Sequence, residues 1–176
     1  MEPNMTGLQD VLWTGDISED LKDRIARDPD VSGFAEPFAY SVGSRTRLKE
    51  VALYTRDGDG KTQCKLTYVT TVQEDMINMN RTMHGGCAVY LIDTCSGAAL
   101  IVLAMATGKP TNSVSQALNT TFHAPAPYGV ELEIVNRTTS LGARVVSAVT
   151  EIWDVTNGRL CVTGAHHKMA PSQPKL

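Results

Sequence analysis

One stretch decides the fold of this chain: His84-Gly85-Gly86-Cys87-Ala88-Val89-Tyr90-Leu91-Ile92-Asp93, which continues to Met105. It opens with a His-Gly-Gly turn and runs on as a nearly all-apolar segment, interrupted by one acid, Asp93. Its length alone would allow a membrane span. Because an acid at the centre of a lone span is costly, we expect instead a central helix that is buried on all sides and wrapped by a sheet. We expect Gly108 to end this helix, just before Pro110.

Alternating polar and apolar residues on both sides of the helix predict strands. The expected strands cover residues 48–56 and 61–72 before the helix, and 113–124, 130–139, 144–155 and 159–168 after it. Asp57-Gly58-Asp59-Gly60 and Asn157-Gly158 are strong turn signals, so they predict hairpins between consecutive strands. The order of elements predicts an α+β fold in which an antiparallel sheet of about six strands covers one long helix.

The 176 residues predict one domain at 45–170, preceded by an N-terminal arm at 1–44 and followed by a tail at 171–176. Within the arm, Ser18 is expected to cap a short helix whose buried face carries Leu21 and Ile25. The stretch from Ser32 to Gly43 shows no clear periodicity and is expected to pack irregularly.

Composition excludes several classes of protein. The formal net charge is −3 and there is no basic cluster, so nucleic acid is not an expected partner. The four cysteines show no CxxC spacing and are expected to be reduced, free thiols rather than zinc ligands. Cys87 and Cys95, eight residues apart on the helix, are expected to be core thiols rather than nucleophiles. Since the first residues are neither basic nor followed by an apolar run, we expect a cytoplasmic protein without a signal peptide or a membrane span. The ending Pro174-Lys175-Leu176 differs at one position from a peroxisomal address, which leaves a peroxisomal location open.

The chemistry of the helix start can be derived from the residues. A helix N-terminus supplies aligned N–H donors and a positive partial charge, and Gly85 and Gly86 would let a substrate approach the backbone closely. Gly86 and Asp93 are seven residues apart, so they share one face of the helix. Within one chain they would lie about 10 Å apart, which is too far to share one scissile bond. A second subunit is the simple way to close this gap.

The pattern Asn78-x5-His84-Gly85-Gly86-x6-Asp93, together with the stretch from Ser115 to Pro125, resembles the hotdog-fold acyl-CoA thioesterases. The resemblance is greatest to the subgroup of thioesterase superfamily member 2 and the phenylacetate-pathway thioesterases. It covers about Leu48 to Met169, so the arm lies outside it. It implies the hotdog fold, hydrolysis of acyl-CoA without a metal or an organic cofactor, and a homodimer or homotetramer.

The resemblance also implies roles for individual residues. Asp93 would act as general base or nucleophile, Asn78 would orient the water or the thioester, and the Gly85 N–H would polarise the thioester carbonyl. Ser115 would help to position water. In this family the asparagine and glycine come from one subunit and the acid from its partner.

Further residues are candidates for contact with substrate: His84, Gly86, Phe122, Ser140, Leu141, Gly142, Arg144 and Lys168. The resemblance places the phosphates of coenzyme A near the turn from Ser140 to Arg144, with Arg144 and Lys168 as cations. His84 is expected to support the turn rather than to transfer protons. The run His166-His167-Lys168 is interpreted as a solvated strand end, with a metal or phosphate contact as the alternative.

Two other functions remain open. A hotdog hydratase or dehydratase would act on an enoyl or hydroxyacyl thioester and would pair an acid with a histidine in other motifs. A non-catalytic acyl-CoA-binding or partner-binding hotdog protein is favoured by the long arm. The sequence leaves acyl chain length, and the choice between aryl and alkyl groups, undetermined because the acyl pocket is built from scattered residues.

Overall fold

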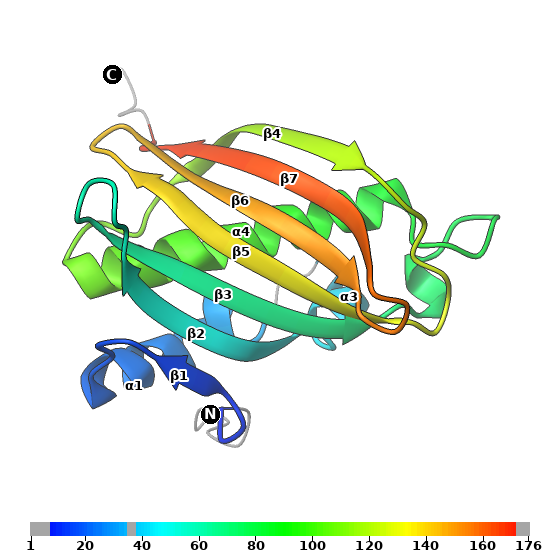
Figure 1. The fold of residues 1–176 in the computed structure, drawn as a ribbon, viewed down its shortest axis with the longest axis horizontal. Helices are drawn as coiled ribbons and strands as arrows, with labels where there is room; N and C mark the ends of the chain where they lie inside the picture. The colour runs from blue at the N-terminus through cyan, green and yellow to red at the C-terminus, as the bar shows by residue number, and fades with distance from the viewer. Residues whose placement is uncertain (1–7, 35–37, 172–176) are drawn as a thin grey trace.

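The computed structural model describes residues 8–34 and 38–171 (Figure 1). The ending Pro174-Lys175-Leu176, on which the peroxisomal expectation depends, lies outside the described residues.

The described residues form one long helix, three short helices, a 3₁₀ turn and seven strands. The helical elements are α1 (Glu19–Arg27), α2 (Pro29–Ser32), α3 (Tyr40–Gly43), η2 (Glu74–Met76) and α4 (Gly85–Thr107). The strands are β1 (Leu12–Thr14), β2 (Arg47–Thr55), β3 (Thr62–Thr71), β4 (Val114–Phe122), β5 (Glu131–Leu141), β6 (Val145–Asp154) and β7 (Arg159–Met169). They form one sheet in the order β1-β2-β3-β5-β6-β7-β4, and α4 crosses one face of it (Figure 1).

This arrangement confirms the predicted α+β hotdog architecture, with one strand more than expected. The seventh strand is β1, which belongs to the arm and pairs in parallel with β2. Three residues are too few to show an alternating pattern, so this strand could not be predicted. All other neighbours pair antiparallel, and both predicted turns form, with Gly60 and Gly158 at positive φ. Gly108 ends α4 at φ 66°, as predicted.

The expectation that α4 is buried on every side is wrong for one of its faces. Most of the helix packs against the sheet, and Ile92 and Leu103 are fully buried there. The opposite stripe, at Gly86, Val89 and Asp93, is exposed in the single chain. The helix is long and apolar enough to cross a membrane, but 67% of its most apolar window is buried inside the protein, as in a core helix.

The arm is packed onto the domain through its apolar residues. Ser18 Oγ accepts a hydrogen bond from the Leu21 N–H and caps α1, as predicted. Val31 and Phe34 are almost completely buried, and the Tyr68 hydroxyl on β3 donates to the Val31 carbonyl at 2.8 Å. The arm therefore lies against α4 and the sheet in a defined position.

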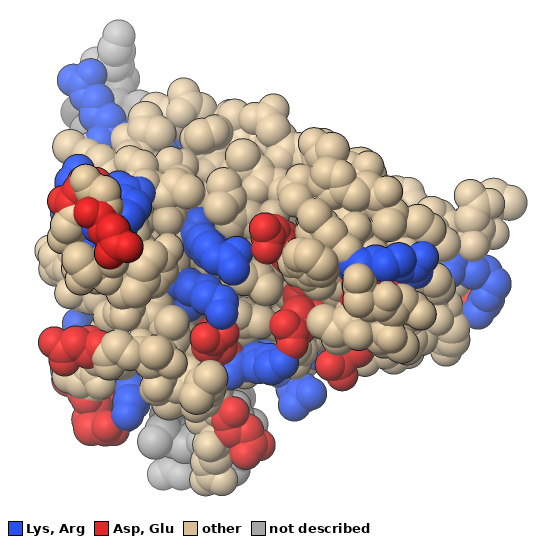
Figure 2. Space-filling model, in the orientation of Figure 1, with Lys and Arg blue, Asp and Glu red and all other residues tan. Residues whose placement is uncertain are grey.

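The outer face of the sheet carries charged side chains of both signs (Figure 2). Lys65 pairs with Glu50, and Arg137 pairs with Glu151. Over β4 and β7 the same face is mostly uncharged (Figure 2), and β4 itself contains no charged residue. Charge of one sign does not accumulate on the face that Figure 2 shows.

Candidate active site

The helix start is built by His84. Its backbone is extended, and its side chain caps α4 because Nδ1 accepts a hydrogen bond from the Gly86 N–H at 2.9 Å. This geometry agrees with the expected structural role of His84 and occupies the Gly86 amide. The Gly85 N–H donates to no described residue.

Asp93 lies two turns further along α4, on the exposed stripe, with half of its side chain accessible. The Ser115 hydroxyl on β4 donates to Asp93 Oδ1 at 2.9 Å. Between Ser115 and Ala117 the pairing of β4 with β7 shifts register, so Gln116 forms a bulge. Bulges of this kind re-aim a neighbouring side chain, and this one lies directly beside Ser115.

His166 on β7 completes the cluster, and sequence reasoning missed it. The interpretation of 166–168 as a solvated strand end is wrong for this residue, whose side chain is fully buried. Its Nε2 lies 3.2 Å from Asp93 Oδ1 and 3.0 Å from Ser115 Oγ. On the other side of the ring, Nδ1 lies 2.7 Å from Ser96 Oγ on α4. His166 thus connects the core of the helix with the exposed carboxylate.

Burial and the neighbouring charges determine which groups of this cluster carry protons. Burial lowers the pKa of His166 to about 4, and the attraction of the Asp93 carboxylate offsets this effect only in part. The ring is therefore neutral near pH 7. An ionised Asp93 accepts hydrogen bonds only, so the tautomer that suits this carboxylate carries its proton on Nε2. On the other side of the ring, the Ser96 hydroxyl lies 2.7 Å from Nδ1 and donates to the Ile92 carbonyl at 2.6 Å. Ser115 and His166 then both donate toward Asp93 Oδ1.

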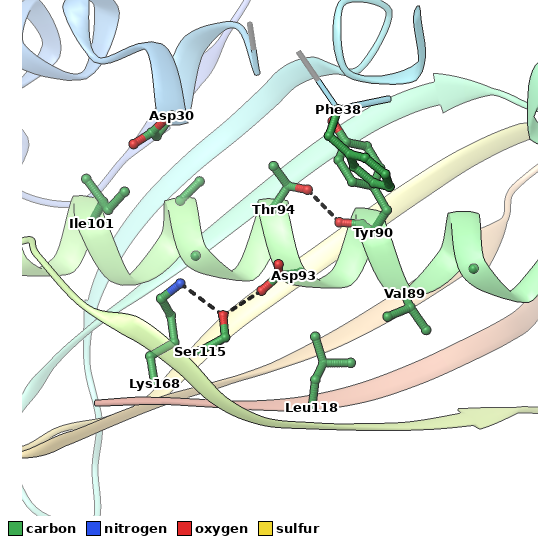
Figure 3. Close-up of a pocket in the computed structure, with 13 residues that line it drawn as sticks. Asp30, Phe38, Val89, Tyr90, Asp93, Thr94, Ile101, Ser115, Leu118 and Lys168 are labelled. Atoms are coloured by element: carbon green, nitrogen blue, oxygen red, sulfur yellow. Dashed lines mark hydrogen bonds between the residues drawn. The ribbon is translucent and has the colours of Figure 1, made fainter. Parts of the chain in front are cut away.

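A pocket of about 530 Å³ opens above these residues (Figure 3). Its floor is the exposed stripe of α4 from Gly86 to Ile101, with Asp93 in the middle. Ser115, Leu118 and Lys168 line it from β4 and β7, and Lys168 Nζ donates to Ser115 Oγ at 3.4 Å. Among the described residues, no group of three or more His, Cys, Asp and Glu side chains is arranged to hold a metal ion.

Asn78 and Gly85 do not reach this pocket within one chain. Asn78 Oδ1 accepts hydrogen bonds from the backbone N–H groups of Asn80 and Thr82, at 2.9 and 3.3 Å, and so shapes the turn before α4. Gly85 lies against Phe122, whose ring atom Cζ would be 3.3 Å from a Cβ at that position. Neither Asn78, Gly85 nor Phe122 lines the pocket at Asp93.

The expected coenzyme A contacts are split between different places. Leu141, Gly142 and Arg144 line a second hollow of about 390 Å³ with Lys109. Ser140 lines a smaller hollow of about 280 Å³, which shares Lys109, Leu141 and Gly142 with the second one. Lys168 belongs to the pocket at Asp93 instead. Lys109 is therefore the cation that lines the second hollow together with Arg144. Its position directly after Gly108, at the end of the helix, did not mark it as a candidate contact.

Comparison with known proteins shows which family this chain belongs to. The profile of the Thioesterase superfamily matches residues 80–161, which include the helix start, Asp93 and Ser115. Acyl-coenzyme A thioesterase 13 of Mus musculus is 32% identical over 104 residues, which are 59% of this chain and 71% of the mouse protein. The crystal structure of thioesterase superfamily member 2 from Mus musculus superposes with a TM-score of 0.54 at 31% identity, covering 61% of this chain and 81% of that one. The zebrafish structure of the same name has a TM-score of 0.62 at 24% identity, covering 77% of this chain and 88% of that one, and shows the fold. The chain belongs to the thioesterase superfamily.

Proposed function

We propose that this chain hydrolyses acyl-CoA thioesters to the free acid and coenzyme A. Membership of the thioesterase superfamily and the acyl-CoA thioesterase activity named for its mouse relative support this function. The observation that carries it is the carboxylate of Asp93, half-exposed in a pocket and fixed at one oxygen by Ser115 and His166. A carboxylate held in this way keeps its second oxygen free for the reaction.

Asp93 supplies the base or the nucleophile of the reaction. As a general base it takes a proton from a water molecule that attacks the thioester carbonyl carbon, and the thiolate of coenzyme A leaves. As a nucleophile it attacks that carbon itself, and water then cleaves the resulting anhydride. In both routes the carbonyl oxygen becomes an oxyanion that needs preorganised donors.

The donors for this oxyanion come, in our proposal, from a second copy of the chain. The free Gly85 N–H lies at the positive end of α4, and the Asn78 side-chain amide N–H₂ has no partner among the described residues. Both lie outside the pocket at Asp93 of their own chain. Antiparallel alignment of α4 from two chains would bring each helix start toward the other chain's Asp93.

The edge of the sheet supports such an assembly. β4 is the last strand in the order and pairs only with β7, so its other edge offers unpaired backbone groups. Val114 and Phe122 at its ends are 47% and 58% exposed, and the strand carries no charge. Edges of this kind are templates for pairing with another chain. The hollow at Lys109 and Arg144 offers two cations for the phosphates of coenzyme A.

The test of the proposed function is the release of free thiol from a series of acyl-CoAs. Asp93→Asn should lower kcat by about 10² to 10⁴ while the fold is kept, since the side chain is half-exposed and nearly isosteric. Thr107→Ser, at the far end of α4, serves as the control. Near-full turnover by a folded Asp93→Asn variant would remove Asp93 from the mechanism.

The same assay separates the hydratase alternative. The contact between Asp93 and His166 is the feature that this alternative would use. Hydration leaves the thioester intact, so an enzyme of that class would change the acyl group without releasing thiol.

A further inference from the structure

The pocket at Asp93 has a second wall, which the arm provides. Asp30 on α2 and Phe38, just before α3, line the pocket opposite Leu118 and Lys168 (Figure 3). The floor between these walls is a groove along α4, where Gly86, Gly97 and Ala98 leave room because their side chains are small or absent. The part of the chain that matches the superfamily, 80–161, contains neither Asp30 nor Phe38.

Phe38 and Asp30 make the two ends of the groove chemically different, one aromatic and one charged. Phe38 contacts Tyr90 edge to face, with ring centroids 5.8 Å apart. Asp30 lies over Ile101 at the other end, where it brings a carboxylate to the groove (Figure 3). An apolar group gains free energy by covering Phe38 and Tyr90, whereas a chain that runs past Ile101 meets the charge of Asp30.

The wall is anchored rather than loosely placed. Val31 and Phe34, which follow Asp30 in the chain, are buried, with 0% and 2% of their surfaces exposed. Phe34 stacks on Tyr68 of β3 at 4.9 Å between ring centroids, and Tyr68 also holds the Val31 carbonyl. On the far side of Phe38, Gly43 packs so closely that an added Cβ would lie 2.7 Å from the Phe34 carbonyl oxygen.

We propose that the N-terminal arm selects the acyl group of the substrate, with Phe38 as the specificity-determining residue. The inference rests on the proposed thioesterase function and adds that acyl groups long or bulky enough to reach the aromatic end of the groove are the better substrates. The Phe38 side chain is 73% exposed in the single chain, so a ligand can cover most of its surface. We expect an acetyl group bound at Asp93 to be too short to contact this ring.

The experiment compares kcat/KM for acetyl-, hexanoyl-, dodecanoyl- and phenylacetyl-CoA in Phe38→Ala and the unchanged protein. Loss of the ring should lower kcat/KM about tenfold for the groups that reach it and leave acetyl-CoA within about twofold, because only the former lose apolar contact. Phe38→Leu should recover most of the loss. Tyr40→Ala is the matched control, since Tyr40 is an exposed aromatic residue on the same arm that does not line the pocket.

A binding measurement keeps the inference separate from the proposed hydrolysis. In Asp93→Asn protein, which is expected to bind without turnover, calorimetric Kd values for the same four acyl-CoAs should show the same selective weakening with Phe38→Ala. Selective weakening without any hydrolysis by the unchanged protein would uphold the arm's role and overturn the thioesterase proposal. An equal effect on all four acyl groups, no effect, or no binding at all would overturn the role of Phe38.

Discussion

At the scale of single residues, the geometry of Asp93 depends on a histidine from a distant part of the chain. His166 reaches the carboxylate from β7, and Ser96 on α4 fixes the ring from behind. A hydrogen bond to a charged group contributes about 1.5 to 3 kcal/mol, which corresponds to about ten- to a hundredfold in rate if it acts on the transition state. We therefore treat His166 as a positioning residue for Asp93.

His166→Ala should lower kcat by about ten- to a hundredfold with little change in KM. His166→Gln should recover much of this loss, because its amide can still donate toward Asp93 while it cannot take up a proton. Steady-state kinetics on one acyl-CoA, with folding checked by circular dichroism, gives the measurement. Equal losses of kcat in both variants would point to a purely structural role for the ring.

The lowered pKa of His166 also makes stability depend on pH. The unfolded chain takes up this proton near pH 6.5, whereas burial delays uptake in the folded protein to about pH 4. Between these values the unfolded state binds more protons, so the stability that the neutral ring provides above pH 6.5 is lost as the pH falls toward 4. Lys168 and His167 on β7 add to this lowering, and Asp93 opposes it.

Urea unfolding at pH 7.5, 6, 5 and 4.5 should show this loss in the unchanged protein and a flatter dependence in His166→Gln. Carboxylates whose pKa is lowered, such as Asp154, act on both proteins alike and cancel in the comparison. Identical slopes for the two proteins would show that the ring does not stay neutral in the folded state.

The apolar run singled out Asp93 and the family resemblance singled out Ser115, but neither pointed to His166, for a physical reason. The acid stands out because it interrupts an apolar run, and its spacing from the His-Gly-Gly turn is short-range information. Successive residues of a strand point to opposite faces, so His166 and His167 are distinguishable only when the register of β7 is known. A signal was present: Gly164 shares a face with His166, and a glycine in a strand marks a close approach.

At the scale of elements, that close approach determines how α4 sits on the sheet. A Cβ at Gly164 would lie 2.7 Å from Ile92 Cγ2, one residue before Asp93. Gly164→Ala should therefore push α4 away and destabilise the protein by about 1 to 3 kcal/mol, as overpacking commonly does. Because the shift occurs directly beneath Asp93, kcat should fall as well.

Chemical unfolding and thiol release on Gly164→Ala give the two measurements. Gly58→Ala is the control, because Gly58 has negative φ and nothing within 4 Å of its would-be Cβ. Wild-type stability of Gly164→Ala would mean that Ile92 moves aside without cost.

Element boundaries that depend on neighbouring residues in the chain could be predicted. Features that depend on pairing with a distant strand could not. The capped helix start, Gly108 and the two glycine turns set boundaries that agree with the structure within a few residues. The bulge at Gln116 and the short parallel strand β1 depend on a partner strand far away in the sequence. For the same reason the contribution of the arm to the pocket could not be predicted, although its helix and buried face could.

At the scale of the whole molecule, one chain contains both halves of the proposed site but keeps them apart. Asp93 and Ser115 line the pocket, with His166 buried behind them, while neither Gly85 nor Asn78 lines it. The uncharged free edge of β4 offers a place where a second copy can add to the sheet. A two-fold dimer would then contain two identical sites, each drawing residues from both chains.

Mixing two inactive variants tests this arrangement directly. In a hybrid of Asn78→Ala and Asp93→Asn chains, one of the two sites receives Asn78 from one chain and Asp93 from the other, both unchanged, while the second site receives both substitutions. Because random mixing makes about half of the dimers hybrid, refolding the two variants together should restore about a quarter of the unchanged activity, provided that subunits pair two-fold. Each variant refolded alone supplies the baseline, and light scattering checks that assembly is kept. If every site instead drew both residues from one chain, each hybrid site would carry one substitution, and the mixture would stay at the baseline.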